Sequence, residues 1–401
     1  MDSTLSRHVR TNGVGSRGSQ LIAVAAGAVL ALTGCSHASP PASAALPGDG
    51  VELVVGTHAN QPSPDVPKAV RARLASAISG EKFIGVLAVE GVPRVLQPPL
   101  PMSVTGETPQ ARAESDRKNT QTLTNLVRNA RPATRGADLL TALLQAATSA
   151  RAAGIPIPRI VAVDSGLSDR GPLNFTVAGM TAAVPADVAA SLLQKHVLSA
   201  TTFAGLTVEF VGLGTDVAPP QSPLSTSQVQ AVSAIYTAVV EAGGGTAVIT
   251  PLPGTGGVAK NDLSVGVVQT GGGKLTLGGT TSLGDTSPIG FEPGTATFRD
   301  PAAARELLKP VAAWLAPGST HRATVIGTTS SAGSESKASD LQLSRARADA
   351  VARLLVSLGA DPSRITAEGR GYIAQPPDRV NGVLDPAKAA QNRVVRITTI
   401  R

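Results

Sequence analysis

Continuous apolar runs constrain the fold of this chain more than any other feature of its sequence. Such runs are typical of strands that helices cover on both faces. Helical patterns separate them: Asp138 begins one that ends at Gly154, and Ser225 begins another with the capping-box spacing to Gln228. This order predicts an α/β fold with a mostly parallel, Rossmann-type sheet flanked by helices. The runs are Phe83–Val89, Arg159–Val163 and Leu206–Leu213, preceded by a shorter β-branched segment, Val51–Gly56.

The composition limits both the size and the chemistry of the protein. Its 401 residues, 42% of them hydrophobic, suffice for two or three domains with ordinary cores. A single cysteine excludes a disulfide framework and a cysteine-based zinc site, and the five histidines show no HxxxH spacing. The net charge of +7 comes with only 2% aromatic residues. We therefore expect no nucleic-acid partner.

The first 35 residues have the three zones of a lipoprotein signal peptide. A basic segment precedes an apolar run, 21–32, that is too short to cross a hydrocarbon core of about 30 Å. Residues 32–35 (LTGC) resemble a bacterial lipobox, which implies acylation of Cys35 (diacylglyceryl and palmitate) and an extracytoplasmic, membrane-anchored protein facing the cell wall. The anchoring membrane is the cell membrane or an outer membrane. An ordinary secretory signal with a chance cysteine is the alternative. Residues 36–50, rich in Ala, Ser and Pro, predict a flexible tether.

Within residues 51–257, the apolar runs from Phe83, Arg159 and Leu206 and the helix from Asp138 follow one another in a characteristic order. In this order the segment resembles a von Willebrand factor A (vWA) domain, which implies a surface for docking a protein partner. Family members with a working metal site carry DxSxS after the first strand of the motif, then a threonine, then an aspartate. Here Ala88–Pro93 lacks the serines, Ala137 stands at the threonine position, and only Asp164 matches. The segments that carry the resemblance are Phe83–Glu90, Gly136–Leu143, Ile160–Gly166 and Val208–Gly214.

Asp164 is thus a weak candidate for a metal ligand. Mg²⁺ prefers a near-octahedral shell of oxygen atoms, and one carboxylate with help from Glu90 is a poor site. In the structural alternative, Asp164 caps the turn before Gly166. We therefore expect the vWA-like fold without its adhesion chemistry, with no bound metal and no cofactor.

Residues 258–286 are rich in Gly and Thr, which predicts a hairpin or an extended connector. Gly271–Lys274 (GGGK) lacks the GxxxxGK[ST] spacing of a phosphate-binding loop. A linker is the better interpretation of this segment.

The C-terminal segment, 287–401, predicts the element order β-α-β-α-β, a long loop and a last strand. Asp300 and Pro301 signal the start of a helix that runs through Trp314. A second helix begins at Asp340 and stops at Gly359. Strands are expected near 289–298, 322–327, 364–368 and 393–400.

One residue interrupts the apolar stripe of that second helix. Arg347 lies at helical spacing between Leu343 and Val351, and the stripe continues at Leu354 and Leu358. An unpaired buried guanidinium is very costly. Arg347 therefore belongs either to a structural arrangement, as an ion pair or reaching out to solvent, or to a ligand site.

Residues from Leu343 to Val351 form an intact LSxxRAxxV motif. With this motif, residues 287–401 resemble the OmpA-like peptidoglycan-associating domain. The resemblance implies that Arg347 binds the carboxylate of diaminopimelate in the peptidoglycan stem peptide, a task that suits a planar guanidinium. Three further segments carry the resemblance: Ile289–Phe298, Arg364–Gly371 and Asn392–Ile397.

The sequence departs from the family where the ammonium of diaminopimelate is bound. Ser330 occupies the aspartate position of GHTDxxG and Thr328 the histidine position. A serine cannot neutralise an ammonium, which could weaken binding by about tenfold. Asp340 or Glu335 could supply the carboxylate instead. The site implied by the resemblance comprises Arg347, Ser330, Asp340, Thr329, Gly294 and Arg393.

The lipobox and the intact LSxxRA motif together predict a non-enzymatic lipoprotein of the cell envelope that links a membrane to peptidoglycan. The alternative is a membrane-tethered interaction scaffold in which both domains have lost their ligands, as the departures at Ser330 and Ala137 indicate. No nucleophile elbow, carboxylate pair or cofactor fingerprint in the sequence indicates an enzyme.

Overall fold

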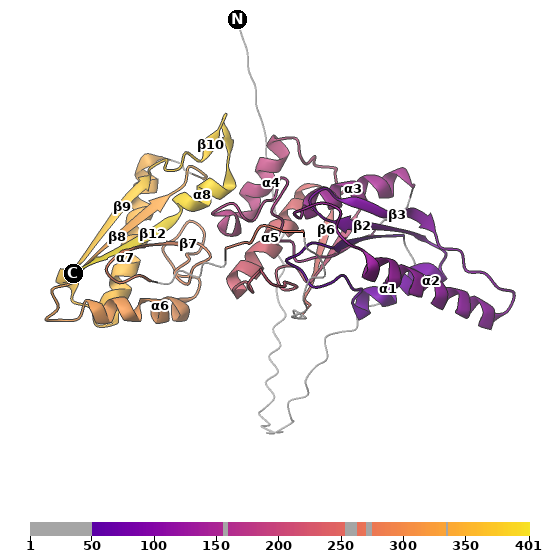
Figure 1. The fold of residues 1–401 in the computed structure, drawn as a ribbon. Coiled ribbons are helices and arrows are strands. Elements are labelled where there is room, and N and C mark those ends of the chain that lie inside the picture. Colours follow the sequence, from indigo (N-terminus) through magenta and orange to yellow (C-terminus); the bar gives the residue numbers. More distant parts are fainter. Residues whose placement is uncertain (1–49, 155–158, 253–262, 270–274, 334–335) are drawn as a thin grey trace, which may run out of the picture. The chain divides into compact units, whose positions relative to one another are not determined.

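The computed structural model describes residues 50–154, 159–252, 263–269, 275–333 and 336–401 (Figure 1). The predicted signal peptide, the lipobox with Cys35 and nearly all of the tether lie outside the described residues, as do Gly271–Lys274 and Glu335. Within the described part of the chain, no helix combines the length and the hydropathy that a membrane span requires.

A six-stranded sheet forms the centre of the middle domain, in the order β3-β2-β1-β4-β5-β6. All neighbouring strands are parallel except β3, which runs antiparallel to β2. The predicted α/β fold with a mostly parallel sheet is therefore confirmed. The strands are β1 (Val51–Gly56), β2 (Phe83–Val89), β3 (Arg94–Pro101), β4 (Arg159–Val163), β5 (Thr207–Val211) and β6 (Thr246–Thr250).

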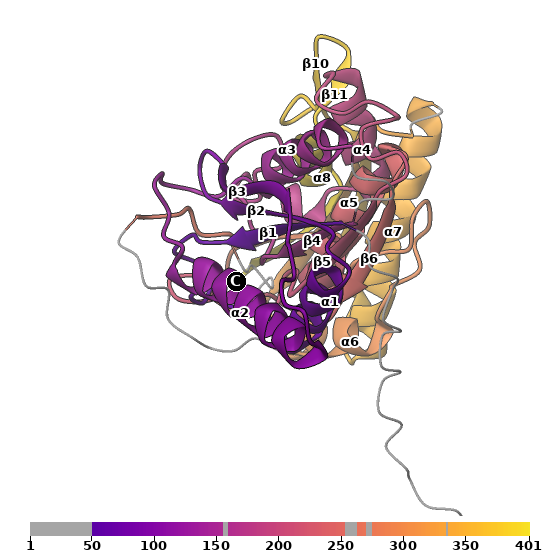
Figure 2. The same cartoon turned by 90° about the vertical axis from the view of Figure 1, so that its right-hand side faces the viewer.

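Helices cover both faces of this sheet (Figure 2). Because side chains alternate along a strand, Leu53 and Val55 pack with α1 and α2, whereas Val54 packs on the other face with α3 and α5. Burial on both faces explains why these strands are continuous apolar runs. The helices are α1 (Lys68–Ser79), α2 (Pro109–Asn129), α3 (Leu139–Ala152), the 3₁₀ helix η1 (Met180–Ala182), α4 (Pro185–Gln194) and α5 (Thr226–Ala242).

The expected helix starts of the middle domain are confirmed. The carboxylate of Asp138 accepts the backbone N–H of Thr141 at 3.0 Å, which caps α3. Ser225 and Gln228 form the predicted capping box of α5. Each cap satisfies backbone donors that the first helical turn leaves without an intrahelical partner.

The C-terminal domain is a four-stranded sheet, β7-β12-β8-β9, on which two helices pack. Strands β8 and β9 are parallel, and β12 runs antiparallel to both β7 and β8. The predicted order β-α-β-α-β with a final strand is observed. The elements are β7 (Thr280–Gly284), α6 (Pro301–Trp314), β8 (Arg322–Thr329), α7 (Lys337–Ser357), the 3₁₀ helix η2 (Pro362–Arg364), β9 (Ile365–Tyr372), β10 (Arg379–Val380), β11 (Val383–Leu384), α8 (Pro386–Asn392) and β12 (Val394–Ile400).

Two expectations for this domain were wrong. The first strand is β7, which lies inside the segment expected as a connector and pairs with β12. Residues 289–298, expected as that strand, make only an isolated bridge between Phe291 and Phe298. The helix expected from Asp340 begins at Lys337, because Ser336 caps it in a box with Ser339. The long loop also contains the β10–β11 hairpin and α8, which the sequence did not indicate.

Close approach of α7 to the sheet sets the position of Arg347. A Cβ atom at Gly327 of β8 would overlap the carbonyl oxygen of Ser344, and one at Gly369 of β9 would overlap the backbone of Arg345. Only glycine permits this backbone-to-backbone distance. The helix face that includes Arg347 is therefore held directly against the sheet.

Two fully buried glutamates lie on opposite faces of the central sheet. Glu209 forms an ion pair with Arg73 and lies 3.6 Å from Arg159. Glu52 has no such cation partner among the described residues. Burial raises the pKa of Glu52 to about 7, and the Ser149 hydroxyl opposes the shift. Folding therefore favours the protonated form of this side chain.

The substitution Glu52→Gln tests this assignment. The unfolded carboxyl ionises near pH 4.5 and the folded one near 7, so the free energy of unfolding falls by about 3 kcal/mol across that window. Outside this window, we expect the free energies of unfolding of the variant and the wild type to change equally with pH. The variant should gain up to about 3 kcal/mol relative to wild type between about pH 4 and about pH 8, measured by urea unfolding. If the free energies of unfolding of the wild type and the variant changed in parallel across this pH range, the raised pKa of Glu52 would be contradicted.

Candidate functional site

Arg347 lies on the buried face of α7 and is only 6% exposed. Its Nε donates a hydrogen bond to the carbonyl oxygen of Thr295 at 2.9 Å. Its guanidinium carbon lies 5.3 Å from the centre of the Phe291 ring, within the range of a cation–π contact. Among the described residues, no carboxylate forms an ion pair with it. Arg347 is therefore neither in a structural ion pair within this part of the chain nor extended into solvent.

Arg393 lines the same hollow as Arg347, together with Asp285 and Phe291. Its Nη1 donates to the hydroxyl of Ser330 at 3.0 Å, and its Nε lies 3.4 Å from the Asp285 carboxylate. About 10 Å³ of the hollow is free, which is about the space of one water molecule. The structure thus shows this site closed around its two arginines.

Burial and three neighbouring charges determine the electrostatics around Arg347. Burial lowers the pKa of Arg347, and the positive charges of Arg393 and Arg299 lower it further, while Asp285 opposes them. A buried cation with two cationic neighbours and one anionic neighbour favours an additional anion.

The remaining predicted residues lie around this hollow at different depths. Ser330 is buried and accepts the Arg393 hydrogen bond, and the neighbouring Thr329 is also buried, with no hydrogen-bond partner for its hydroxyl among the described residues. Gly294 is exposed, next to the residue whose carbonyl binds Arg347. Asp340 is buried at the start of α7, against Gly371 of β9. The structure thus brings Arg347, Arg393 and Ser330 together and places Asp340 two helical turns before Arg347.

Thr328 at the histidine position has a structural role. Its hydroxyl donates to the carbonyl oxygen of Asn392 at 2.6 Å, which ties the end of β8 to the start of β12. The departure at Thr328 therefore maintains the sheet around the site.

Three acidic residues that no sequence motif marks lie near this site. Asp285 follows β7, Asp187 lies in the first turn of α4, and Asp378 lies in the loop before β10. Burial opposes ionisation of Asp378, but hydrogen bonds from the Ser331 backbone and the Tyr372 hydroxyl hold its pKa below the usual range. Only the tertiary fold places these residues near Ser330, and no motif marks them.

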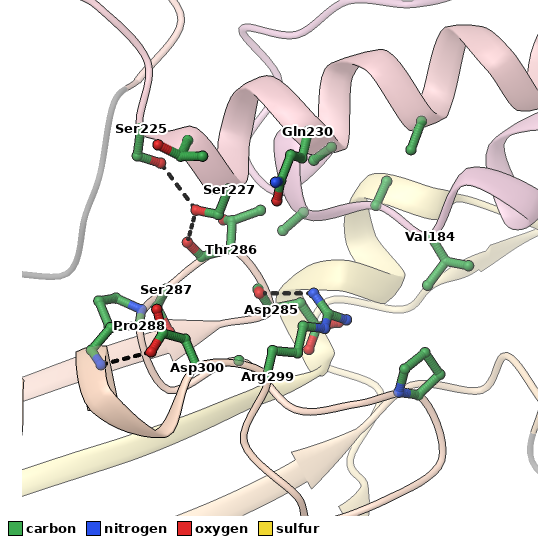
Figure 3. Close-up of a pocket in the computed structure, with 18 of the residues that line it drawn as sticks. Val184, Ser225, Ser227, Gln230, Asp285, Thr286, Ser287, Pro288, Arg299 and Asp300 are labelled. Carbon is green, nitrogen blue, oxygen red and sulfur yellow. Dashed lines mark hydrogen bonds between the residues drawn. The ribbon is translucent and has the colours of Figure 1, made fainter. Parts of the chain in front are cut away.

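A larger cavity of about 800 Å³ adjoins the hollow (Figure 3). Its wall combines the first turns of α5 with the segment from 285 to 303, and it shares Asp285 and Gly290 with the hollow. At its wall, the hydroxyl of Ser227 donates to the carbonyl oxygen of Thr286 at 2.9 Å. The guanidinium of Arg299 donates to the carbonyl oxygen of Asp285 at 3.2 Å. Space for a ligand larger than one side chain therefore lies next to the arginine hollow, with Asp285 and Gly290 lining both.

Asp164 at the carboxyl edge of the parallel sheet is engaged within the protein. Its Oδ1 accepts the N–H of Gly166 at 2.6 Å, as the turn-capping alternative predicts, and its Oδ2 lies 2.9 Å from His58 Nε2. Burial lowers the pKa of His58, but the charge and hydrogen bond of Asp164 more than offset it, so the pKa is raised. Glu90 binds Arg94 and the backbone of Thr134. Among the described residues, no group of three or more His, Cys, Asp or Glu side chains could hold a metal ion.

Comparison with known families identifies the domain that contains the arginine hollow. Residues 290–390 match the model of the OmpA family. The C-terminal part of the chain is therefore an OmpA-like domain, and Arg347, Ser330 and Thr295 all lie within it. None of the curated proteins matches the chain.

Several solved structures resemble about a third of the chain. The periplasmic domain of MotB from Helicobacter pylori is 20% identical, with 31% of this chain and 75% of that chain covered and a TM-score of 0.25. The peptidoglycan-associated lipoprotein from Burkholderia pseudomallei is 24% identical, with 29% and 88% covered and a TM-score of 0.23. An outer membrane protein from Borrelia burgdorferi B31 is 22% identical, with 32% and 94% covered and a TM-score of 0.22.

The substitution Arg347→Met tests whether this arginine stabilises the OmpA-like domain. Methionine fills a similar volume and removes a buried charge that has no carboxylate partner, so stability should be unchanged or higher by about 1 kcal/mol. Chemical unfolding of the full chain measures this, with the exposed Arg345→Met as the control on the same helix. A loss of about 2 kcal/mol or more would show that Arg347 is a structural residue.

Proposed function

We propose that this protein is a non-enzymatic lipoprotein of the cell envelope whose OmpA-like domain binds the peptidoglycan stem peptide through Arg347. One observation carries the proposal: a buried guanidinium lies in a hollow with no carboxylate partner among the described residues. The buried Nη2 of Arg393, in the same hollow, also lacks a hydrogen-bond partner in the described part. A ligand carboxylate would satisfy both groups with charge-assisted hydrogen bonds.

Binding requires the hollow to widen at the turn that carries Thr295. Residues 292–295 are exposed, and their contact with Arg347 is a single hydrogen bond to a neutral carbonyl oxygen. A ligand carboxylate is the stronger acceptor, so it can displace that carbonyl. The adjoining cavity of about 800 Å³ then accommodates the neighbouring units of the peptidoglycan.

The membrane end of the link is the acylated Cys35. The support is the lipobox at residues 32–35, which follows a short apolar run and contains the only cysteine of the chain. Two acyl chains on one residue are sufficient for stable anchoring. The tether at 36–50 then separates the membrane from the folded domains.

The middle domain is, in this proposal, a vWA-like domain that docks a protein partner. Its support is the strand order 3-2-1-4-5-6 with one antiparallel strand at the β3 edge. In this sheet the strand at the centre is β1, not β2. The segment that corresponds to the DxSxS metal motif therefore follows Gly56 at the end of β1, and not Val89 at the end of β2. His58 occupies that segment and binds Asp164. A buried His–Asp contact thus takes the place of an oxygen-rich cation shell.

The alternative function is a membrane-tethered scaffold that has lost ligand binding. Two observations favour it: Ser330 cannot neutralise an ammonium, and only about 10 Å³ of the hollow is free. Co-sedimentation with insoluble peptidoglycan separates the two functions, because a scaffold is retained by protein partners and not by the wall polymer.

Co-sedimentation of the full chain with insoluble peptidoglycan tests the wall-binding proposal. We expect Arg347→Ala to reduce the bound fraction at least about tenfold, since a charge-assisted bidentate contact is lost. The lysine variant should recover little of it, because an ammonium cannot bind a carboxylate through two parallel hydrogen bonds. Arg345→Ala is the matched control, since Arg345 is an exposed arginine paired with Asp349 on the same helix. Equal sedimentation of wild type and Arg347→Ala would refute the proposal.

Metabolic labelling with palmitate tests the anchor. The wild type should incorporate label and fractionate with membranes, whereas Cys35→Ser should do neither, because a thioether cannot form without the thiol. Membrane association of an unlabelled wild type would show instead an ordinary secretory signal with another mode of retention.

A further inference from the structure

Charge is unevenly distributed across the arginine hollow. On one side, Arg347 has no carboxylate partner among the described residues. On the other side, Arg393 lies 3.4 Å from the Asp285 carboxylate and 3.4 Å from the Asp187 carboxylate. Two carboxylates around one guanidinium leave that side with a net charge of about −1.

The other charged groups near Ser330 do not change this balance. Asp378 is buried, and its oxygens accept hydrogen bonds from Ser331 N–H, the Tyr372 hydroxyl and the Asn392 amide. Arg379 lies beside it and donates to the hydroxyl of Ser331 at 3.1 Å. These two opposite charges offset each other. Arg299 acts on Arg347 and donates to the backbone carbonyl oxygen of Asp285, not to its carboxylate. The excess negative charge on the Ser330 side therefore depends on Asp187.

Asp187 belongs to the middle domain, and α8 holds it near the OmpA-like domain. The side-chain amide of Gln391 donates to the carbonyl oxygen of Ala178 at 2.6 Å. A Cβ atom at Gly179 would overlap the carbonyl oxygen of Ala387, so the two backbones are in direct contact there. Ala387 also lies in the same apolar cluster as Met180, Ala183 and Val188. The position of Asp187 is thus set by a packed contact as well as by its ion pair with Arg393.

We propose that Asp187 supplies the negative charge that binds the ammonium of the ligand, so that the middle domain contributes a specificity-determining residue to the site. This inference rests on the proposed function. The free end of the diaminopimelate side chain carries one carboxylate and one ammonium. Its carboxylate pairs with Arg347, and its ammonium lies on the Ser330 side, where Asp187 and Asp285 together outweigh Arg393.

The exposure of Asp187 fits this role. Its side chain is 23% exposed, whereas that of Asp285 is 14% exposed and that of Arg393 is 11% exposed. Burial raises the pKa of Asp187, and Arg393 opposes that shift. An ammonium beside the carboxylate would add to the effect of Arg393 and favour the ionised form.

Three synthetic stem peptides separate the two charges of the ligand. The first contains diaminopimelate, the second contains 2-aminopimelate, which keeps the side-chain carboxylate and lacks the ammonium, and the third contains lysine, which keeps only the ammonium. Affinities are measured by calorimetry with the full chain. The wild type should bind the first peptide more tightly than either of the others.

The substitution Asp187→Asn should reduce affinity for the diaminopimelate peptide about five- to tenfold, to the level of the aminopimelate peptide, whose affinity should not change. Asp349→Asn is the matched control, since it removes a partly exposed carboxylate on α7 that pairs with Arg345. The melting temperature of each variant checks the fold.

The outcomes are distinguishable. If the wild type does not prefer the diaminopimelate peptide over the lysine peptide, the proposed function fails, and the inference fails with it. If that preference exists and depends on Arg347, but Asp187→Asn still discriminates the diaminopimelate peptide from the aminopimelate peptide, only the inference fails. Tighter binding of every peptide by Asp187→Asn would show that Asp187 competes with the ligand, which also overturns the inference.

Discussion

The guanidinium of Arg347 is buried against a carbonyl oxygen and an aromatic ring instead of a carboxylate. The rest of the site depends on this arrangement, because a buried charge with weak partners is costly and a ligand anion would offset that cost. The close packing of α7 on Gly327 and Gly369 holds the backbone of this part of the helix against the sheet. In the proposed function, Arg347 lowers the stability of the folded protein and provides a contact for a ligand anion.

The two domains are connected through charge as well as through apolar packing. Arg393 follows α8 and contacts Ser330 and Asp285 in its own domain and Asp187 in the middle domain. The apolar cluster of the middle domain includes Ala387 of α8. A change in the position of the middle domain would therefore alter the charge around the hollow.

Much of the fold could be predicted from the sequence, because local signals there agreed with the tertiary structure. The caps at Asp138, Ser225 and Asp300 located three helices, and the apolar runs located the buried strands. The strand β7 (TTSLG) escaped prediction because it has no apolar run and is defined by its pairing with β12. The small helix α8 escaped for a similar reason, since its alanines are buried by contacts with distant segments.

Less of the candidate site could be predicted. The stripe of α7 marked Arg347 as unusual, but its acceptor, Thr295, depends on the geometry of a turn 52 residues earlier in the chain. Asp285 and Asp187 carry no motif, and only the docking of separate elements places them beside Arg393. Long-range contacts of this kind lie beyond the reach of spacing and composition.

The most direct test of the account is an NMR titration that follows the side-chain Nε–H signal of Arg347 in the full chain. Addition of a stem peptide that contains diaminopimelate should shift this signal saturably, because the N–H exchanges the Thr295 carbonyl for a ligand carboxylate. The lysine-containing peptide should leave it in place. An unmoved Arg347 signal at saturating diaminopimelate peptide would contradict the account.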